Sequence, residues 1–524
     1  MLNKFFNSFN INNLYILLIF IFTFFINKHY ASLGVFPIDT FLHFDSGYGI
    51  LNNEHPIKDY WVVSGIFVDY LGAIFFYFLG SNWNAHTIHA SLLNSAISIF
   101  TYILLTKLNL KKTFSFIYAI FFGILAYTPS GTPFLDHHSM FFSLAGAYFF
   151  ILALKFDKIY FWIIFPWFFA FSFLSKQVPS SYLIILTSML LISYSILIKK
   201  YKPLILTFVS TIFIFLFFII FCLYIGIDLN SFFQQYILYP QSIGSDRINS
   251  IFAVNIESIF NKYKYLILPI LCLFFVSKKL FIEFRYNNKI KNFFIFLTFI
   301  SIAISFIFHQ ILTKNQIYIY FLIPLLFSFF TICLNEIPIR NKNYFILIAL
   351  LVTLLITGKY HIRYNEERKL HELENVSFKK AVNAKNISSK LNGLKWITPN
   401  FKDNPEVEIK KLKNIYEILL KDKNKKILIT HYSFFSTILG ENINSFTRTY
   451  TMDGASFPVL DNKYYSNYKK HIEKKIKSRR IKYIYFIKFE EIDVRVITDY
   501  LDKNCFNIEE DIYFKKFIVD QNCF

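Results

Sequence analysis

Long segments without a charged residue are the feature that most limits how this chain can fold. Residues 208–225, 293–308 and 317–334 contain only uncharged, mostly apolar residues. A helix of roughly 20 residues crosses the ~30 Å hydrocarbon core of a bilayer, and a helix satisfies its own backbone hydrogen bonds there. Because 55% of the 524 residues are hydrophobic, we expect an all-α polytopic membrane protein.

The apolar segments predict about eleven transmembrane helices. They are residues 13–26, 86–106, 114–127, 140–154, 160–174, 181–198, 204–225, 265–276, 293–311, 317–334 and 344–357. The stretch 62–80 is also apolar, but it carries Asp69 and, in its interior, Gly65 and Gly72, which weaken helices. Whether this stretch crosses the membrane decides on which side every later loop lies.

Basic residues distinguish the two topologies. Lys and Arg concentrate in five segments between apolar runs, namely 107–112, 155–158, 199–202, 278–291 and 340–342. If 62–80 lies in the membrane interface, all five fall on the same side as Lys4, which the positive-inside rule favours. If it spans, the amino terminus falls on the opposite side from all five. We therefore predict an interfacial or re-entrant helix at 62–80.

The formal net charge of +21 has an explanation in the bilayer. Lys and Arg beside apolar runs contact anionic lipid head groups. The sequence contains no basic helix with interleaved aromatic residues, so we expect no nucleic-acid partner. The lipid bilayer is the first partner that the sequence predicts.

The chain divides into two predicted domains, a membrane domain at 1–358, with a first outer loop at 28–62, and a polar segment at 359–524. In the second domain, "KKILITHY" and "IKYIYFIKF" predict buried strands, and "NIYEILLKDK" and "VRVITDYLDKN" predict helices. We expect an α/β domain outside the membrane, joined to the last span by a charged, exposed helix at 361–391.

The cysteines near the carboxyl terminus and the apolar run near the amino terminus each lead to one further expectation. Cys505 and Cys523 fall in the polar tail; an outward-facing tail would let them form a disulfide, and two free thiols fit the sequence equally well. Near the amino terminus, no small-residue cleavage site follows the apolar run 14–26. We therefore expect an uncleaved first span rather than a signal peptide.

The first outer loop holds several ionisable residues in a chain that elsewhere keeps them out of its apolar runs. "FLHFDSGYGILNNEHPIKDYW", residues 41–61, contains Asp45 and Asp59. Asp136 lies at the outer start of a later predicted span, beside two histidines. Carboxylates at a membrane edge are costly unless they have partners or a function. Asp45 and Asp136 are therefore candidate functional residues.

The order of features in this region resembles the beginning of GT-C glycosyltransferases of the protein O-mannosyltransferase and lipid A aminoarabinose transferase type. In that superfamily the first outer loop carries an Asp, often followed by a Tyr, then a second Asp and an interfacial helix. Here Asp45, Tyr48, Asp59 and the stretch 62–80 stand in that order. Three later segments, "FLDHHSMFF", "FLSKQVPSS" and "TKNQIYIYFLIPLL", resemble further short motifs of the family. The resemblance covers about residues 10–360.

The resemblance implies transfer of a sugar from a polyprenyl-phosphate carrier to a lipid, glycan or protein acceptor at the outer face of a bacterial inner membrane. An acceptor hydroxyl needs a base, for which Asp45 is the candidate, with Asp136 as the second catalytic residue. A departing phosphate needs positive or hydrogen-bonding partners, here Lys176, Gln177, Lys314 and Arg247. The residues expected to bind substrate or organise loops are Tyr48, Asp59, His137, Tyr318 and Tyr320. A divalent metal ion stays open, and we expect Asp39 and Asp69 to be structural.

Two other classes of function fit a chain of this composition. A transporter or flippase of lipid-linked sugars would have ionisable groups near the membrane midplane, whereas here they lie at span ends. A polymerase or ligase of surface polysaccharide would use basic residues in a large outer loop, and the loop 227–264 offers few. No glycine-rich phosphate loop is present, so soluble nucleotide-sugar chemistry is not indicated.

Overall fold

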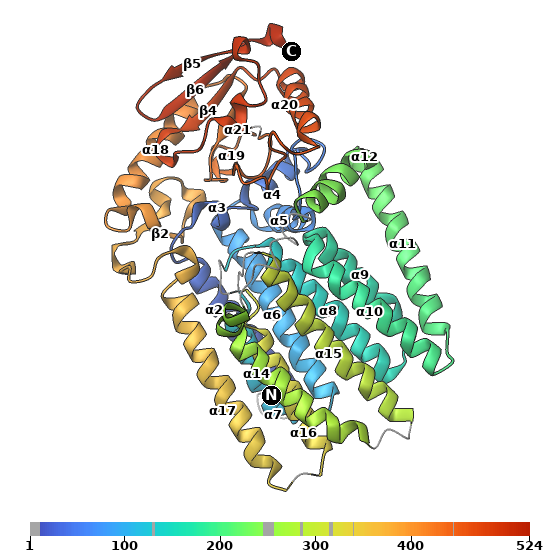
Figure 1. Ribbon diagram of the computed structural model, residues 1–524. Coiled ribbons are helices and arrows are strands. Elements are labelled where there is room, and N and C mark those ends of the chain that lie inside the picture. The colour runs from blue at the N-terminus through green and yellow to red at the C-terminus, as the bar shows by residue number, and fades with distance from the viewer. Residues whose placement is uncertain are drawn as a thin grey trace, which may run out of the picture.

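A bundle of long helices carries a smaller C-terminal segment with strands at one of its ends (Figure 1). The computed structural model describes residues 11–127, 131–244, 256–282, 287–313, 318–338, 340–443 and 445–524. The first loop lies between the bundle and the C-terminal segment. Its short helices are α3 (Pro37–Thr40) and α4 (Phe44–Leu51), and α5 (Ile66–Leu79) follows it.

Within the described residues, eight helical segments are long and apolar enough to cross a bilayer. They are built on α2 (Ile11–Ala31), α6 (Trp83–Lys107), α8 (Leu135–Phe156), α10 (Gln177–Leu197), α11 (Lys202–Ile225), α14 (Ile256–Ile282), α15 (Asn287–Leu312) and α17 (Lys342–His361). Three bundle helices are shorter, namely α7 (Lys112–Ala126), α9 (Ile159–Ser175) and α16 (Leu322–Glu336). The chain is a multi-pass helical membrane protein, and the count of about eleven spans stays a prediction.

The two ends of the bundle differ in charge. The basic turns between α6 and α7, α8 and α9, α10 and α11, and α16 and α17 lie at the end away from the C-terminal segment (Figure 1). Lys200 of one turn pairs with Asp157 of another across 3.8 Å. The fifth basic segment, 278–291, lies partly outside the described residues. The fold therefore gathers four of the five segments at one end, and which end faces the cytoplasm stays a prediction.

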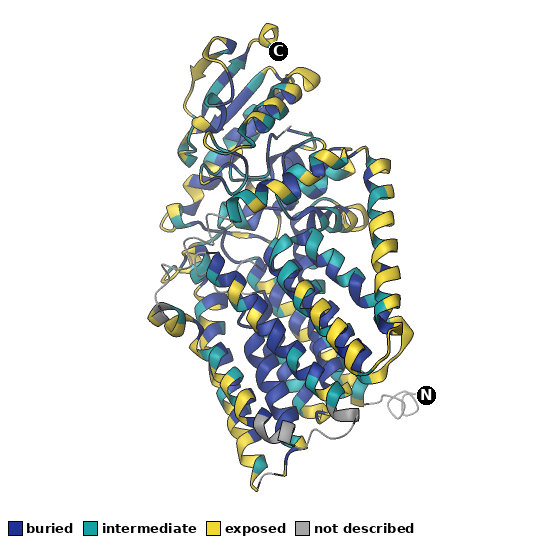
Figure 2. Cartoon of the chain, turned by 45° about the vertical axis from the view of Figure 1, so that its right-hand side comes forward, coloured by how far each residue is buried: buried dark blue, intermediate teal, exposed yellow. Residues whose placement is uncertain are grey.

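Apolar side chains cover the outside of the bundle as well as its interior. Figure 2 shows buried residues filling the bundle and exposed residues along its outer helices. In α11 only Pro203, Ser210 and Cys222 are buried, while Phe208 and Phe213 are more than half exposed. A soluble protein rarely exposes a continuous apolar surface of this kind. Lipid chains are its natural cover.

Helix α5 packs closely on α4 because glycines face each other in both. A Cβ atom on Gly47 would lie 3.1 Å from the carbonyl carbon of Gly72. Before α5, Gly65 has a φ of +82°, and a side chain there would contact His43 and Arg448. At 1.5 Å per residue, the 14 residues of α5 span about 21 Å. That length suits the interfacial helix that the sequence predicts, although it begins later than expected.

The C-terminal segment contains a four-stranded mixed sheet with strand order β3-β4-β6-β5. Its elements are α18 (Pro405–Lys421), β3 (Lys426–Ile429), α19 (Phe435–Leu439), α20 (Tyr465–Arg479), β4 (Tyr483–Ile487), β5 (Phe506–Glu510) and β6 (Phe514–Val519). Strands β3 and β4 are parallel, with Ile427 opposite Ile484, and β6 runs antiparallel to β4 and β5. The strands predicted in 425–432 and 481–489 and the helix predicted in 414–423 are confirmed.

Helices cover both faces of this sheet. Side chains alternate between the faces along each strand, so Leu428 and Tyr485 pack in the cluster that contains α18. Ile427 and Ile484 pack in the cluster that contains α20. Strands β3 and β4 are therefore buried on both faces, which explains why their sequences are mostly apolar.

Two predictions of helices in the C-terminal segment are wrong in extent. The segment 361–391 is a series of short π and 3-10 turns rather than an exposed helix. Arg368 and Glu372 adopt positive φ values, which interrupt a helix, and the Arg368 side chain is buried. The helix expected in 494–504 is a single turn, α21 (Arg495–Thr498). In both places tertiary packing overrides local helix propensity.

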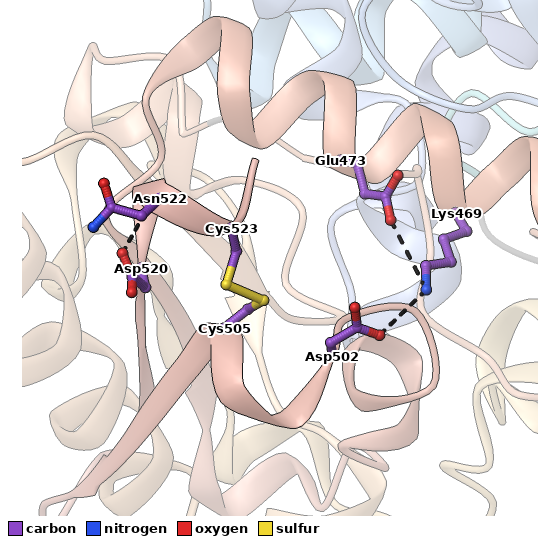
Figure 3. Close-up of a disulfide and its surroundings, with 7 residues drawn as sticks. All are labelled: Lys469, Glu473, Asp502, Cys505, Asp520, Asn522 and Cys523. Carbon is purple, nitrogen blue, oxygen red and sulfur yellow. Dashed lines mark hydrogen bonds and ion pairs between the residues drawn. A yellow bond between two sulfur atoms is a disulfide. The ribbon is translucent and has the colours of Figure 1, made fainter.

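Cys505 and Cys523 form a disulfide beside the edge strand β5 (Figure 3). The sequence left this pairing open, and the structure has the bond. It joins the start of β5 to the last helical turn of the chain. The bond therefore fixes the carboxyl terminus against the sheet.

We expect the double substitution C505S/C523S to lower the free energy of unfolding of the C-terminal segment by about 3 kcal/mol, because opening the loop raises the entropy of the unfolded chain. Chemical unfolding of the full chain, followed by amide exchange in β5 and β6, measures this change. Non-reducing peptide mapping of the wild type should find the two cysteine peptides linked. Complete alkylation of both thiols without a reductant would contradict the bond.

Candidate functional site

Three side chains from three helix ends meet where the bundle faces the C-terminal segment. Asp136 lies in the first turn of α8, Lys176 at the junction of α9 and α10, and His309 in the last turn of α15. The Lys176 ammonium donates to both Asp136 carboxylate oxygens at 2.7 Å. His309 Nε2 lies 3.0 Å from Asp136 Oδ1. We call these three residues the Asp136 cluster; its carboxylate is only 5% exposed.

Local backbone structure places this charge pair at helix ends. Lys176 has extended backbone angles, φ −162° and ψ 135°, which end α9 and turn the chain into α10. A carboxylate in the first turn of α8 also interacts favourably with the positive end of that helix. The hydroxyl groups of Ser143 and Ser172, 2.6 Å apart, join α8 to α9 beneath the pair. Buried charges of opposite sign are tolerated because each supplies the other's partner.

A second carboxylate, that of Asp39, lies near this cluster. Asp39 belongs to α3 and is half-buried. Burial raises the pKa of the Asp39 carboxyl to about 7, and the Asp136 carboxylate adds to the rise. Burial raises the pKa of the Tyr318 hydroxyl as well, with contributions from the same two carboxylates. Among the residues that the structure describes, none donates a hydrogen bond to the Asp39 carboxylate.

Aromatic rings pack against one another beside the Asp136 cluster. His137 is fully buried, stacks on Tyr127 with ring centroids 4.9 Å apart, and lies 5.9 Å from the Tyr318 ring. The Tyr318 backbone N–H donates to the side-chain oxygen of Gln310 at 2.6 Å. The fold therefore brings together four residues that the sequence singles out: Asp136, His137, Lys176 and Tyr318.

Asp45 lies instead in the contact between the first loop and the C-terminal segment. Its carboxylate accepts hydrogen bonds from the backbone N–H groups of Ser436 and Thr437, at 3.0 and 2.8 Å, and from the Thr437 hydroxyl at 2.6 Å. Burial raises the pKa of Asp45 to about 6, although these hydrogen bonds oppose the rise. The carboxylate thus joins α4 to the start of α19. Its catalytic role stays a prediction.

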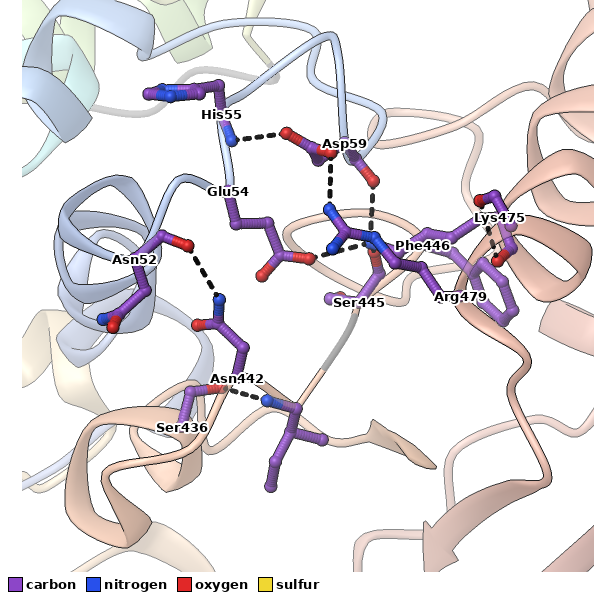
Figure 4. Close-up of polar contacts among 12 residues, drawn as sticks. Asn52, Glu54, His55, Asp59, Ser436, Asn442, Ser445, Phe446, Lys475 and Arg479 are labelled. Carbon is purple, nitrogen blue, oxygen red and sulfur yellow. Dashed lines mark hydrogen bonds and ion pairs between the residues drawn. The ribbon is translucent and has the colours of Figure 1, made fainter. Parts of the chain in front are cut away.

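Other acids of the first loop also contact the C-terminal segment (Figure 4). Lys475 of α20 donates to Glu54 Oε1 at 3.1 Å and to the Asp59 carbonyl oxygen at 2.7 Å. Arg479, one turn later, donates to Asp59 Oδ1 at 2.9 Å. We call Glu54, Asp59, Lys475 and Arg479 the docking cluster, because these ion pairs hold the first loop against α20.

Asp69 forms a third link of this kind. Its carboxylate is fully buried, and His43 Nδ1 lies 2.6 Å from Oδ1. The Arg448 guanidinium of the C-terminal segment donates to its other oxygen and, at 2.5 Å, to the Ser64 carbonyl oxygen. Arg448 therefore connects the start of α5 to the C-terminal segment.

Gln177 uses its side chain to hold backbone rather than to face the Asp136 cluster. Its amide nitrogen donates to the carbonyl oxygens of Val63 and Tyr236, at 2.7 and 2.6 Å. An amide nitrogen has two hydrogens, so both are used. Phosphate binding by this side chain, as the sequence suggested, requires those hydrogen bonds to break.

The remaining predicted site residues lie elsewhere or outside the described part of the chain. The Tyr320 hydroxyl donates to the Tyr364 hydroxyl at 2.6 Å within an aromatic cluster. Tyr48 lies on α4, with the Lys390 ammonium 5.7 Å from its ring centroid. The residues outside the described ranges are Arg247 and Lys314.

The sequence-based assignment did not include His309 among the candidate site residues, and it expected Asp39 to be structural. Asp39 lies shortly before Asp45 in the same loop, and no local pattern distinguishes one from the other. Only the fold decides which of the two carboxyls lies within reach of the Asp136 charge. For His309 a signal exists: a His-Gln pair ends a long apolar run, and polar residues in such places have a partner or a function.

The arrangement limits what could be bound here. In the described residues no group of three or more His, Cys, Asp or Glu side chains is placed to hold a metal ion. What the site offers is a carboxyl with a pKa near neutrality, a fixed lysine and a buried phenol. Such a set suits proton transfer next to an anionic group.

Comparison with known proteins adds no family to these observations. No protein-family model matches the chain, and no curated protein matches it. The chemistry of the residues around Asp136 is therefore the basis for any functional assignment.

Proposed function

We propose that this chain is a membrane glycosyltransferase of GT-C type, which moves a sugar from a polyprenyl-phosphate carrier to a lipid, glycan or protein acceptor. The observation that carries the proposal is the buried Asp136 cluster at one end of the bundle, with the Asp39 carboxyl close enough for the Asp136 charge to raise its pKa. A lipid-linked donor reaches such a site from the bilayer, and a polar acceptor reaches it from water. In this proposal about eleven helices span a bacterial inner membrane.

In this mechanism Asp39 is the general base. An acceptor hydroxyl is a weak nucleophile, and a carboxylate removes its proton most effectively when the carboxyl pKa lies near the working pH. The pKa of about 7 at Asp39 meets that condition. Asp136, which is ion-paired with Lys176, is less suited to accept a proton. The role that the sequence suggested for Asp45 therefore passes to Asp39.

Lys176 is the residue that stabilises the leaving phosphate. Negative charge grows on the phosphate oxygens as the sugar departs, and a fixed cation lowers the energy of that state. An ammonium group has three N–H donors, and Asp136 occupies at most two of them. The remaining donor is available to a phosphate. Asp136 and His309 then position the ammonium.

The proposal includes an extracytoplasmic C-terminal segment. Its support is the disulfide between Cys505 and Cys523, since disulfides persist in oxidising compartments. The positions of the ionisable residues also argue against a transporter, because Asp136, Lys176 and His309 all lie at helix ends and not at mid-helix.

The test is transfer by the full chain in lipid nanodiscs supplied with a panel of synthetic polyprenyl-phosphate sugars carrying radiolabelled sugar. A membrane extract serves as acceptor source, and release of polyprenyl phosphate is measured beside incorporation of label. Transfer from one donor supports the proposal. In a second arm the chain is reconstituted in sealed vesicles, where translocation of the donor without any transfer would favour the flippase alternative and overturn the proposal.

We expect Lys176→Met to reduce transfer by about 10²-fold or more, with Lys176→Arg retaining part of the activity. The reason is that methionine keeps the length of the side chain but removes the cation. Lys200→Met, at the opposite end of the bundle, is the matched control and should transfer like the wild type. If K176M and the wild type had equal turnover, Lys176 would not be the residue that stabilises the leaving phosphate.

A further inference from the structure

A small polar cavity lies where the first loop meets the C-terminal segment. Its volume is about 70 Å³. Residues from both parts of the chain line it, among them Asp45, Glu54, Tyr60, Ser433, Asn442 and Arg448. No residue of the Asp136 cluster is among its lining residues. The neighbourhood of Glu54 and Asn442 is visible in Figure 4.

Buried polar atoms in this lining lack a partner among the described residues. These are the Tyr60 hydroxyl, the side-chain oxygen of Asn442 and Nε of Arg448. The Arg448 side chain is only 8% exposed. Lys475 contacts only one carboxylate oxygen of Glu54, Oε1. Buried polar groups in folded proteins nearly always have a hydrogen-bond partner, supplied by protein, water or ligand. Unpaired donors and acceptors in one cavity therefore indicate a bound polar molecule.

The charged groups in the lining already have partners within the chain. Glu54 pairs with Lys475 at 3.1 Å, and the Arg448 guanidinium pairs with Asp69. Asp45 accepts three hydrogen bonds. An anionic ligand would meet two carboxylates and a guanidinium that is already paired, so the cavity favours an uncharged polar ligand.

The size and composition of the cavity suit a single sugar ring. A buried water needs roughly 10–15 Å³ of such space, so the cavity holds about five waters, a volume close to that of one monosaccharide. The aromatic residues Tyr60 and Tyr450 line it beside hydroxyl-bearing residues. A sugar presents hydroxyl groups to polar side chains and C–H faces to aromatic rings. A few placed polar groups on an aromatic wall are typical of small-molecule sites.

We propose that this cavity binds one uncharged sugar residue, and that this sugar belongs to the acceptor; only the second statement rests on the proposed function. The cavity then holds a saccharide acceptor at the interface between the first loop and α19. It gives the C-terminal segment a role in substrate binding. The acceptor class that follows is a glycan or glycolipid rather than an unglycosylated protein.

The experiment measures binding of neutral methyl glycosides of common hexoses and N-acetylhexosamines to the full chain in nanodiscs, by saturation-transfer NMR and calorimetry. Ser433→Phe fills the cavity and should weaken binding by about tenfold or more, because the ring occupies the sugar position. Asn442→Ala removes one acceptor and should weaken binding by a factor of about five. Ser466→Phe, at an exposed position of α20, is the control and should bind like the wild type.

Saturable binding of a neutral glycoside, lost in S433F and weakened in N442A, supports the proposal. It is overturned if no neutral glycoside binds, if a sugar phosphate binds in preference, or if a folded N442A and S433F both bind as the wild type does. Asp39→Asn separates the two proposals, since it should lose transfer and keep glycoside binding. If the wild type binds a glycoside but transfers no sugar, the cavity remains assigned as a sugar site and the proposed glycosyltransferase function is wrong.

Discussion

Asp39→Asn should reduce sugar transfer by about 10²–10⁴-fold. Asparagine has nearly the same size as aspartate but accepts no proton, so the acceptor hydroxyl would attack without a base. The donor and acceptor contacts at Lys176 and in the interdomain cavity are unchanged, and KM should therefore change little. Initial rates with a labelled polyprenyl-phosphate sugar in nanodiscs measure both quantities.

The pH dependence of the wild type checks the same assignment. A base must be ionised to act, so kcat/KM should rise about tenfold per pH unit below the pKa of Asp39 and level off above it. The raised pKa of about 7 places that bend near neutrality. The residual activity of D39N should lack the bend.

Asp45→Asn is the matched control for this prediction, because it makes the same change in a nearby carboxylate of the first loop. We expect D45N to keep the bend near pH 7, since Asp45 contacts α19. If D45N rather than D39N lost the bend and the activity, Asp45 would be the base, and the assignment of Asp39 would fall.

Lys475→Met should lower the free energy that holds the first loop against the C-terminal segment by about 3–5 kcal/mol. Lys475 is 5% exposed and donates to Glu54 and to the carbonyl oxygens of Asp59 and Ser445. Burial lowers the pKa of the Lys475 ammonium, and the Glu54 carboxylate opposes that change. Without the ammonium, the Glu54 carboxylate is left buried with no cation. Amide exchange in α4 and α20 should become at least about a hundredfold faster.

Lys474→Met is the control, because that neighbouring lysine is exposed and its loss should change exchange little. The double variant K475M/E54Q should recover part of the lost free energy, since it removes the unpaired carboxylate as well. Unchanged exchange in K475M, or no recovery in the double variant, would show that the docking cluster does not hold the first loop.

The sequence predicted most of the helical fold because apolar length is a local property. Each long uncharged run became a bundle helix, and the basic segments identified which helix ends lie together. The strands β3 and β4 were predicted for the same reason, since β4 is apolar throughout and β3 is apolar after Lys426. The segment 361–391 was not, because the buried position of Arg368 depends on contacts with distant parts of the chain.

The sequence by itself determined a multi-pass helical protein with a strand-containing C-terminal segment, and it identified Asp136 and Lys176 as residues of interest. It did not decide which first-loop acids face the membrane domain and which hold the C-terminal segment. Asp39 and Asp45 are neighbours along the chain, yet one lies near Asp136 and the other bonds to α19. That division comes from the turn between α3 and α4 and from docking of residues far apart in sequence. Only the tertiary structure contains that information, because the partners of each carboxylate come from other helices.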